Sequence, residues 1–442
     1  MHLLDRLRTL RDSFVMIPAL FITTAIVLSF ALVALDRSVA YGPEATSVFF
    51  FTVGPEGARG ILSAIASTVL SVATMAFSIT ISVMSTASSS FGPRLVRNFM
   101  SDRGNQIVLG TFTSTFLYCL MVMRTIQSDD TDVSQGSFVP HLAVNFSMVL
   151  ALACVAVLIY FINHIASGIQ VSTIATTVQQ KYLKLIEKRF HAEEAASEAF
   201  ESYSDNHLPD AFTYQVHAET NGYVVDIERL TLGKKLAKSI AGVHIFVCPG
   251  DHLVKGQLIA TIQAPRELDD QQVEQISSTV RQLCSVGESR TEYDDIRFLQ
   301  DQIVELGVRA LSPGTNDPFT LTNSTHELTV GLIRAAQAEH AKNSVFVGGE
   351  LKVRFEPVEA SELVDSAFDN FRSYALNHEQ CVIDLLNMAG KVIALGDNEP
   401  AVARARWHAA VLLEYFRATK PHDYSLALVT DAYERYVVEH RF

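Results

Sequence analysis

The sequence predicts an α-helical membrane protein with four transmembrane helices, followed by a C-terminal cytoplasmic region of α+β structure. Apolar stretches long enough to cross a bilayer about 30 Å thick occur only within residues 1–166. Residues 1–165 contain no lysine and nine arginines against nine acidic residues, so the whole net charge of −13 lies after residue 165. Beyond residue 167, apolar residues recur with the periods of amphipathic helices and half-buried strands. These observations divide the chain into a membrane domain and a water-soluble region.

The four spans are long apolar runs without an acidic residue at mid-membrane. They cover residues 14–35, 60–88, 105–126 and 141–165. Basic residues precede the first span and follow the second, whereas the segment after the third span carries acidic residues and no base. Because short cytoplasmic loops collect Lys and Arg, both termini and the 89–104 loop are expected in the cytoplasm. The loops 36–59 and 127–140 would then face outward.

The soluble region is predicted to contain a stalk helix over 167–204, a small β lobe over 205–265 and an α-rich cytoplasmic domain over 266–442. In the β lobe, Pro249–Leu258 is similar to the strand-turn-strand unit of small barrels and lipoyl-type sandwiches, in which glycines make tight turns. One further strand is expected at 350–355. Helical patterns cover 268–285, 291–311, 318–341, 359–375, 378–395, 399–417 and 424–438.

The second span carries a stripe of hydroxyl residues that bears directly on function. Its members recur every three or four positions and therefore share one face of a helix. Hydrocarbon offers no water to polar side chains, so the stripe must face other helices or an aqueous path. The candidate pore-lining residues are Ser67, Ser71, Thr74, Ser78, Ser82, Ser85 and Ser89.

Two further groups of residues are candidates for function. Acidic residues in the outward loops form a candidate outer vestibule that would concentrate cations. These are Glu44, Glu56, Asp129, Asp130 and Asp132. In the loop after the second span, Arg94 and Arg97 can meet lipid phosphates or acidic residues of the soluble domain.

A turn rich in Pro and Gly is predicted between two helices of the soluble region, at Ser312–Gly314. Asn316 follows the turn, Asp317 is expected to cap the second helix, and Pro318 takes the first helical position. A loop of this kind needs no function beyond the turn itself. Its free amide groups could also cradle a ligand.

Several classes of protein are disfavoured. An acidic soluble region repels the phosphates of nucleic acid. The five cysteines, which show no CxxC pair or regular spacing, indicate neither a disulfide framework nor a metal site. They are Cys119, Cys154, Cys248, Cys284 and Cys381. The sequence has no serine-hydrolase, zinc-protease, Walker or dinucleotide motif, so no enzymatic activity, cofactor or metal is expected.

Four segments carry a family resemblance: Ala58–Ser63, Phe77–Thr80, Ser88–Leu95 (SSSFGPRL) and Arg309–Thr320 (RALSPGTNDPFT). Together they resemble the bacterial predicted-membrane-protein family catalogued as a domain of unknown function, numbered twenty-two fifty-four. The resemblance covers nearly the whole chain and implies a four-helix protein of the bacterial inner (cell) membrane with a cytoplasmic domain. It implies no activity. Members of the family often have Asp-Ile-Ala-Leu directly before the Arg309–Thr320 motif. This chain has Glu305-Leu306-Gly307-Val308 at that place.

Two functional hypotheses follow from the stripe. In the first, the protein is a homo-oligomeric ion channel in which the second span lines the pore, with a weak preference for cations and a regulatory cytoplasmic domain. In the second, the protein is a non-conducting membrane scaffold or sensor, and the stripe packs helices together. The expected partners are the lipid bilayer, further copies of the chain and inorganic ions.

Overall fold

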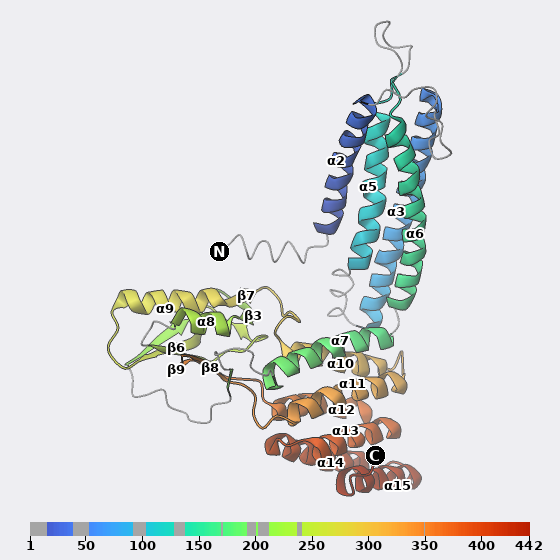
Figure 1. Cartoon of the computed structure of the whole chain (residues 1–442). Coiled ribbons are helices and arrows are strands. Elements are labelled where there is room, and N and C mark those ends of the chain that lie inside the picture. Colours follow the sequence, from blue (N-terminus) through green and yellow to red (C-terminus); the bar gives the residue numbers. More distant parts are fainter. Residues whose placement is uncertain are drawn as a thin grey trace. The chain divides into compact units, whose positions relative to one another are not determined.

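The computed structural model describes residues 16–38, 53–91, 103–127, 138–168, 171–191, 200–201, 212–236, 241–348 and 350–442. The chain forms two compact units, Met1–Gln170 and Val171–Phe442. Figure 1 labels their elements.

Four helices make up the described part of the first unit: α2 (Met16–Ser38), α3 (Pro55–Phe91), α5 (Arg103–Met123) and α6 (His141–Gly168). All four are long and apolar enough to cross a membrane. The four predicted spans are thereby confirmed as helices. The largest difference is at α3, which begins at Pro55 because proline is favoured in a first turn.

Helix α5 is the central helix of this unit, because its contacts with α2, α3 and α6 are the most extensive between these helices. Half of its apolar window is buried, compared with 22% in the other spans. Small residues allow this close packing. A Cβ at Gly110 of α5 would lie 3.2 Å from the Phe21 ring and 3.3 Å from Pro18 Cα, both on α2.

Polar side chains join the ends of these helices. The Asp36 carboxylate, at the end of α2, accepts the backbone N–H groups of Leu142 (3.0 Å) and Ala143 (3.1 Å) in the first turn of α6. Tyr118 Oη donates to the Ala143 carbonyl at 2.9 Å. At the start of α3, Arg59 donates to the Ile126 carbonyl beyond α5 at 3.0 Å. The bonds made by Asp36 and Arg59 satisfy backbone groups at or beyond helix ends that lack an intrahelical partner.

The second unit contains a stack of helices, seen as successive layers in Figure 1. They are α7 (Val171–Ile186) with a π-helical turn (Glu187–His191), α10 (Ile296–Ala310), α11 (Pro318–Ala336), α12 (Ala360–Ala375), α13 (Glu379–Leu395), α14 (Glu399–Ala418) and α15 (Asp423–Tyr433) with a second π-helical turn (Glu434–Val438). The predicted helices from 291 to 438 correspond closely to these elements. Helix α7 packs against α10 and α11, and its buried Tyr182 donates to Gln300 at 2.6 Å.

The strands of the second unit form two sheets. The six-stranded sheet has the order β1 (Phe200–Glu201), β8 (Ser344–Val347), β9 (Glu350–Phe355), β4 (Gly242–Ile245), β6 (Leu258–Ala264) and β2 (Phe212–His217). The three-stranded sheet has the order β5 (His252–Leu253), β3 (Gly222–Ile227) and β7 (Cys284–Gly287). Because β1 and β2 are free edges of the larger sheet, the described strands do not close into the barrel that the sequence suggested.

Both sheets share one apolar core with two helices, α8 (Arg229–Leu236) and α9 (Asp270–Leu283). Strand β9 occupies the predicted residues and pairs in parallel with β4, whereas its antiparallel partner β8 was not predicted. The helix predicted to run to residue 204 is wrong at Phe200 and Glu201, which pair with Val345 and Ser344 of β8. Pairing with a sheet edge here overrides local helix propensity.

Candidate functional site

Helix α3 presents its hydroxyl stripe away from the rest of its unit. The face of α3 that packs inward consists of small and aliphatic residues: Ala58, Leu62, Ala66, Val69, Ala73 and Ala76, all less than 7% exposed. The stripe residues Ser67, Ser71, Thr74, Ser78, Ser82 and Ser85 are all exposed. At 3.6 residues per turn, the centre of the stripe lies roughly 160° around the helix from the centre of the buried face. Ser89 belongs to α3, but its side chain lies outside the described part of the structure.

Three of the stripe hydroxyls bond to their own helix. Ser71 Oγ donates to the Ser67 carbonyl at 2.8 Å, and Thr74 Oγ1 donates to the Leu70 carbonyl at 2.9 Å. Ser67 Oγ similarly donates to the Ala64 carbonyl at 3.2 Å. Back-bonding of this kind occupies the hydroxyl proton and leaves oxygen lone pairs directed outward. At Ser67, Ser71 and Thr74 the stripe therefore exposes hydrogen-bond acceptors.

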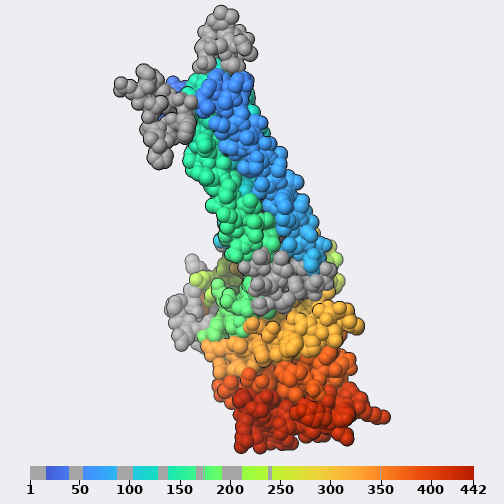
Figure 2. Space-filling model, turned by 90° about the vertical axis from the view of Figure 1, so that its right-hand side faces the viewer, coloured from blue at the N-terminus to red at the C-terminus, as the bar shows by residue number. Residues whose placement is uncertain are grey.

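Exposed apolar residues flank the stripe on both sides. Leu70, Phe77 and Ile81 lie on one side, with exposed fractions of 44–46%, and Met75 and Ile79 lie on the other. Figure 2 shows α3 as a continuous strip of the surface of this unit, beside α6. Helix α3 thus has three outward zones, in which a polar centre separates two apolar margins.

The structure describes only some of the remaining predicted site residues. Glu56 is exposed at the start of α3, with an oxygen 4.0 Å from an Arg59 nitrogen. Glu44, Asp129, Asp130, Asp132, Arg94 and Arg97 lie outside the described residues. Asn316 and Asp317 belong to the second unit, whereas the stripe belongs to the first.

The motif Arg309–Thr320 forms the predicted turn. Helix α10 ends at Ala310, Asn316 has a φ of 46°, and the Asp317 carboxylate accepts the backbone N–H groups of Phe319 (3.1 Å) and Thr320 (3.3 Å) at the start of α11. Asp317 N–H also donates to the Ala310 carbonyl at 2.8 Å, which closes the loop. The Phe319 side chain is 81% exposed.

The departure from the family pattern just before this motif has a packing explanation. A Cβ at Gly307 would lie 2.8 Å from the Phe371 ring and 3.2 Å from Ser324 Cβ. Helix α10 therefore approaches both α11 and α12 closely at Gly307. An alanine at this position would require the Phe371 ring of α12 to shift.

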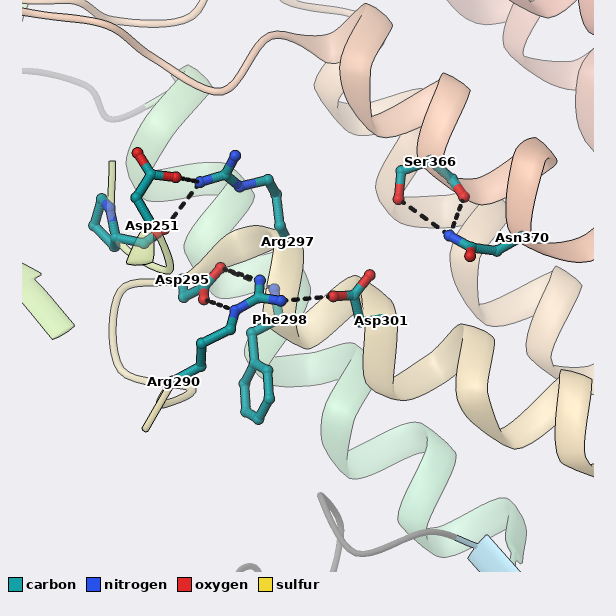
Figure 3. A network of polar contacts seen from close by, with 9 residues as sticks. Asp251, Arg290, Asp295, Arg297, Phe298, Asp301, Ser366 and Asn370 are labelled. Atoms are coloured by element: carbon teal, nitrogen blue, oxygen red, sulfur yellow. Dashed lines mark hydrogen bonds and ion pairs between the residues drawn. The ribbon is translucent and has the colours of Figure 1, made fainter. Parts of the chain in front are cut away.

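A charged junction in the second unit was not predicted from the sequence. Arg290 makes two bonds to the buried Asp295 carboxylate, of 2.7 and 3.0 Å, and a third to Asp301, of 2.9 Å (Figure 3). Arg297 donates to Asp251 at 2.5 Å. Asp295 also caps α10 by accepting the Phe298 N–H at 2.9 Å. The junction therefore ties the Pro249–Asp251 turn to the start of α10.

Asp294 is the centre of a second cluster of ion pairs, next to this junction. Its side chain is fully buried and pairs with Arg189, with Arg229 at 3.1 Å and with Lys188 at 3.3 Å. Burial and the nearby Arg189 lower the pKa of Arg229 to about 10. Burial and the charge of Asp294 raise the pKa of Asp226 above its ordinary value. The two consecutive acids at 294 and 295 were a signal for charge pairing here, but Arg229 and Arg189, the partners of Asp294, lie 65 and 105 residues away from it in the chain.

These features define a multispan α-helical membrane protein with a C-terminal α+β unit. The chain belongs to the family described as "Predicted membrane protein (DUF2254)", whose model matches residues 11–391, and this confirms the family resemblance. Uncharacterized proteins of Mycobacterium bovis and Mycobacterium tuberculosis H37Rv are 30% identical to it over 275 residues, or 62% of this chain and 52% of each relative. The chain thus spans about half the length of these relatives. No solved structure matches it.

Proposed function

We propose that the protein is a homo-oligomeric ion channel of the bacterial inner membrane, with α3 lining the pore. The observation that carries the proposal is the exposure of every described stripe residue on the face of α3 opposite its packed face. This polar row on the outside of a single unit has no partner on another described helix of that unit. A ring of copies would turn this row towards a shared axis.

The apolar margins of α3 support a ring. In a symmetric assembly the centre of a pore-lining helix faces the lumen, and its two sides contact the neighbouring copies. Leu70, Phe77 and Ile81 on one side, and Met75 and Ile79 on the other, would make those contacts. Outward lone pairs of back-bonded hydroxyls can replace part of the hydration shell of a cation without trapping it. A weak cation preference follows, reinforced by the exposed acid Glu56.

The proposal includes the orientation and the role of the soluble unit. Both termini lie in the cytoplasm, as the distribution of arginines in the short loops indicates. The second unit then serves as the regulatory domain. No catalytic activity is proposed for it.

A second candidate function, a non-conducting scaffold or sensor, is favoured by small residues on the same exposed face. Gly60, Ala64, Ser67 and Ser71 follow one another at intervals of three or four, and a Cβ at Gly60 would meet nothing within 4 Å. Small residues at this spacing let two helices approach closely in a membrane. In this case copies would associate through the stripe itself and leave no conduit.

Cysteine labelling in liposomes, combined with ion flux, separates the two functions. The five native cysteines are buried, so they can be replaced by alanine to give a silent background. For a channel, cysteines at Ser71, Thr74, Ser78 and Ser82 react with a water-soluble thiol reagent, whereas cysteines at the buried Ala73 and Ala76 stay protected. Uniform protection with no flux from the cysteine-free protein would contradict the proposal.

A single bulky substitution provides the functional counterpart. Ser78→Leu should abolish flux and leave particle size unchanged, because an apolar side chain dewets a narrow constriction. Ile79→Leu is the matched control, since it changes the adjacent apolar margin conservatively and should conduct normally. If Ser78→Leu instead dissociates the particle, the stripe is a packing surface and the scaffold function stands.

A further inference from the structure

A small pocket lies beside Asp294 in the second unit, and its charged lining comes from distant parts of the chain. Arg189 follows α7, Arg229 begins α8, Asp294 precedes α10, and Lys342 and Glu356 flank β8 and β9. The remaining lining is mainly apolar and includes Cys248, Phe355 and Val358. The pocket volume is about 30 Å³, room for a few water-sized groups.

Arg229 is an incompletely paired cation in this lining. Its side chain is 4% exposed, one nitrogen donates to Asp294 at 3.1 Å, and its guanidinium stacks 4.5 Å from the centre of the Phe355 ring. The Nε–H of Arg229 is buried and has no hydrogen-bond acceptor among the described residues. Buried donors are almost always paired, by protein, water or ligand, so this nitrogen marks a position for an acceptor.

The charge balance of the lining favours an anion. Arg229 and Arg189 share one oxygen of Asp294, so two guanidinium groups are held against a single carboxylate oxygen. The other acid in the lining, Glu356, is directed to His244 at 3.0 Å and is half-exposed. Guanidinium N–H groups match the oxygens of a phosphate in geometry as well as in charge.

We propose that this pocket binds one phosphate group, with Arg229 and Arg189 as its principal ligands. The bound oxygens would accept the Nε–H of Arg229 and occupy the volume between the two guanidinium groups. The phosphate can belong to a soluble solute or to a lipid headgroup, since the recognising chemistry is the same. This inference is independent of ion conduction, because it concerns binding alone.

Calorimetric titration of the full-length protein in detergent with inorganic phosphate, at constant ionic strength set by potassium chloride, tests the site. We expect one phosphate per chain and a loss of affinity of about tenfold or more in Arg229→Gln and Arg189→Gln, the scale of a charge-assisted hydrogen bond. Lys188→Gln is the matched control. Lys188 contacts the same carboxylate at 3.3 Å but is 57% exposed and does not line the pocket, so affinity should change by less than about threefold.

Further variants and a lipid titration complete the test. If Arg229→Gln does not fold, Arg189→Gln and the pocket-filling Val358→Phe decide. Arg189→Gln should weaken binding by about tenfold or more, and Val358→Phe should abolish saturable binding. Dioctanoyl phosphatidic acid, compared with dioctanoyl phosphatidylcholine, identifies a headgroup if it binds where inorganic phosphate does not. Absence of saturable binding by both phosphate and phosphatidic acid, or equal affinities in Arg229→Gln and Lys188→Gln, would overturn the proposal.

Discussion

Substitution of Gly250 by alanine should destabilise the second unit through the charged junction. Gly250 has a φ of +95°, and a Cβ there would lie 2.2 Å from Asp295 Oδ2. The positive φ alone costs a non-glycine residue about 1–2 kcal/mol. The carboxylate would also have to move by about an ångström to reach an ordinary contact distance, which disrupts its bonds to Arg290 (2.7 and 3.0 Å) and to the Phe298 N–H (2.9 Å). Disrupting a buried ion pair of this kind adds about 3 kcal/mol.

Gly256 supplies the matched control for this prediction. It has a φ of +87°, and a Cβ there would meet nothing within 4 Å, so Gly256→Ala carries the backbone term without the clash. With roughly 2–4 °C in Tm per kcal/mol for a domain of this size, Gly250→Ala should lower the Tm of the second unit by roughly 8–20 °C, and Gly256→Ala by roughly 2–8 °C. The assay is thermal unfolding of the full-length protein in detergent, followed by circular dichroism. Equal shifts for the two variants would refute the role assigned to the Asp295 contact.

Three further predictions concern other parts of the chain. Asp36→Ala should lower the stability of the membrane unit by about 1–2 kcal/mol, because the first turn of α6 loses its cap, whereas Glu56→Ala at an exposed site should change it little; equal losses would contradict this. Burial lowers the pKa of His408 below its ordinary value near 6.5, against the opposing effect of Asp365, so the folded state binds this proton less readily than the unfolded state. The stability that the neutral His408 side chain contributes is present above pH 6.5 and is lost as the pH falls through the lowered pKa. The Tm difference between wild type and His408→Gln should therefore be smaller at pH 5.5 than at pH 7.5. Reporters placed after Phe442 and near Arg97 should lie in the cytoplasm and one near Ser134 outside; a cytoplasmic Ser134 would refute the four-span topology.

The sequence predicted elements well where one local rule governs them. Four apolar runs became four helices, because nothing but a helix satisfies the backbone of such a run in hydrocarbon. The turn at Ser312–Gly314 and the cap at Asp317 follow from local bonding, so they too could be predicted. Strand β9 was predicted from its alternation of apolar residues, whereas β8, whose four residues include three apolar ones, gives too short a pattern.

Long-range charge pairing could not be predicted from one sequence. The acids at 294 and 295 are adjacent in the chain, but they serve different clusters. Asp294 pairs with bases from near α7 and from α8, whereas Asp295 pairs with Arg290, five residues away. Only the fold determines which of many arginines reaches which carboxylate. The charged junction and the pocket beside Asp294 therefore needed the structure.

The structure shows which way the hydroxyl stripe faces, which the sequence alone could not show. Period alone places seven residues on one face of a helix, but it does not say whether that face points into the unit or out of it. The inward face of α3 is filled by alanines and aliphatic residues, so packing among the described helices of one unit does not explain the stripe. The two functional hypotheses, in which water or further copies of the chain meet the stripe, both need α3 to present it at the surface of its unit, as the structure does. Particle size in Ser78→Leu separates these alternatives, because a leucine that blocks a lumen leaves subunit contacts at Leu70 and Met75 intact.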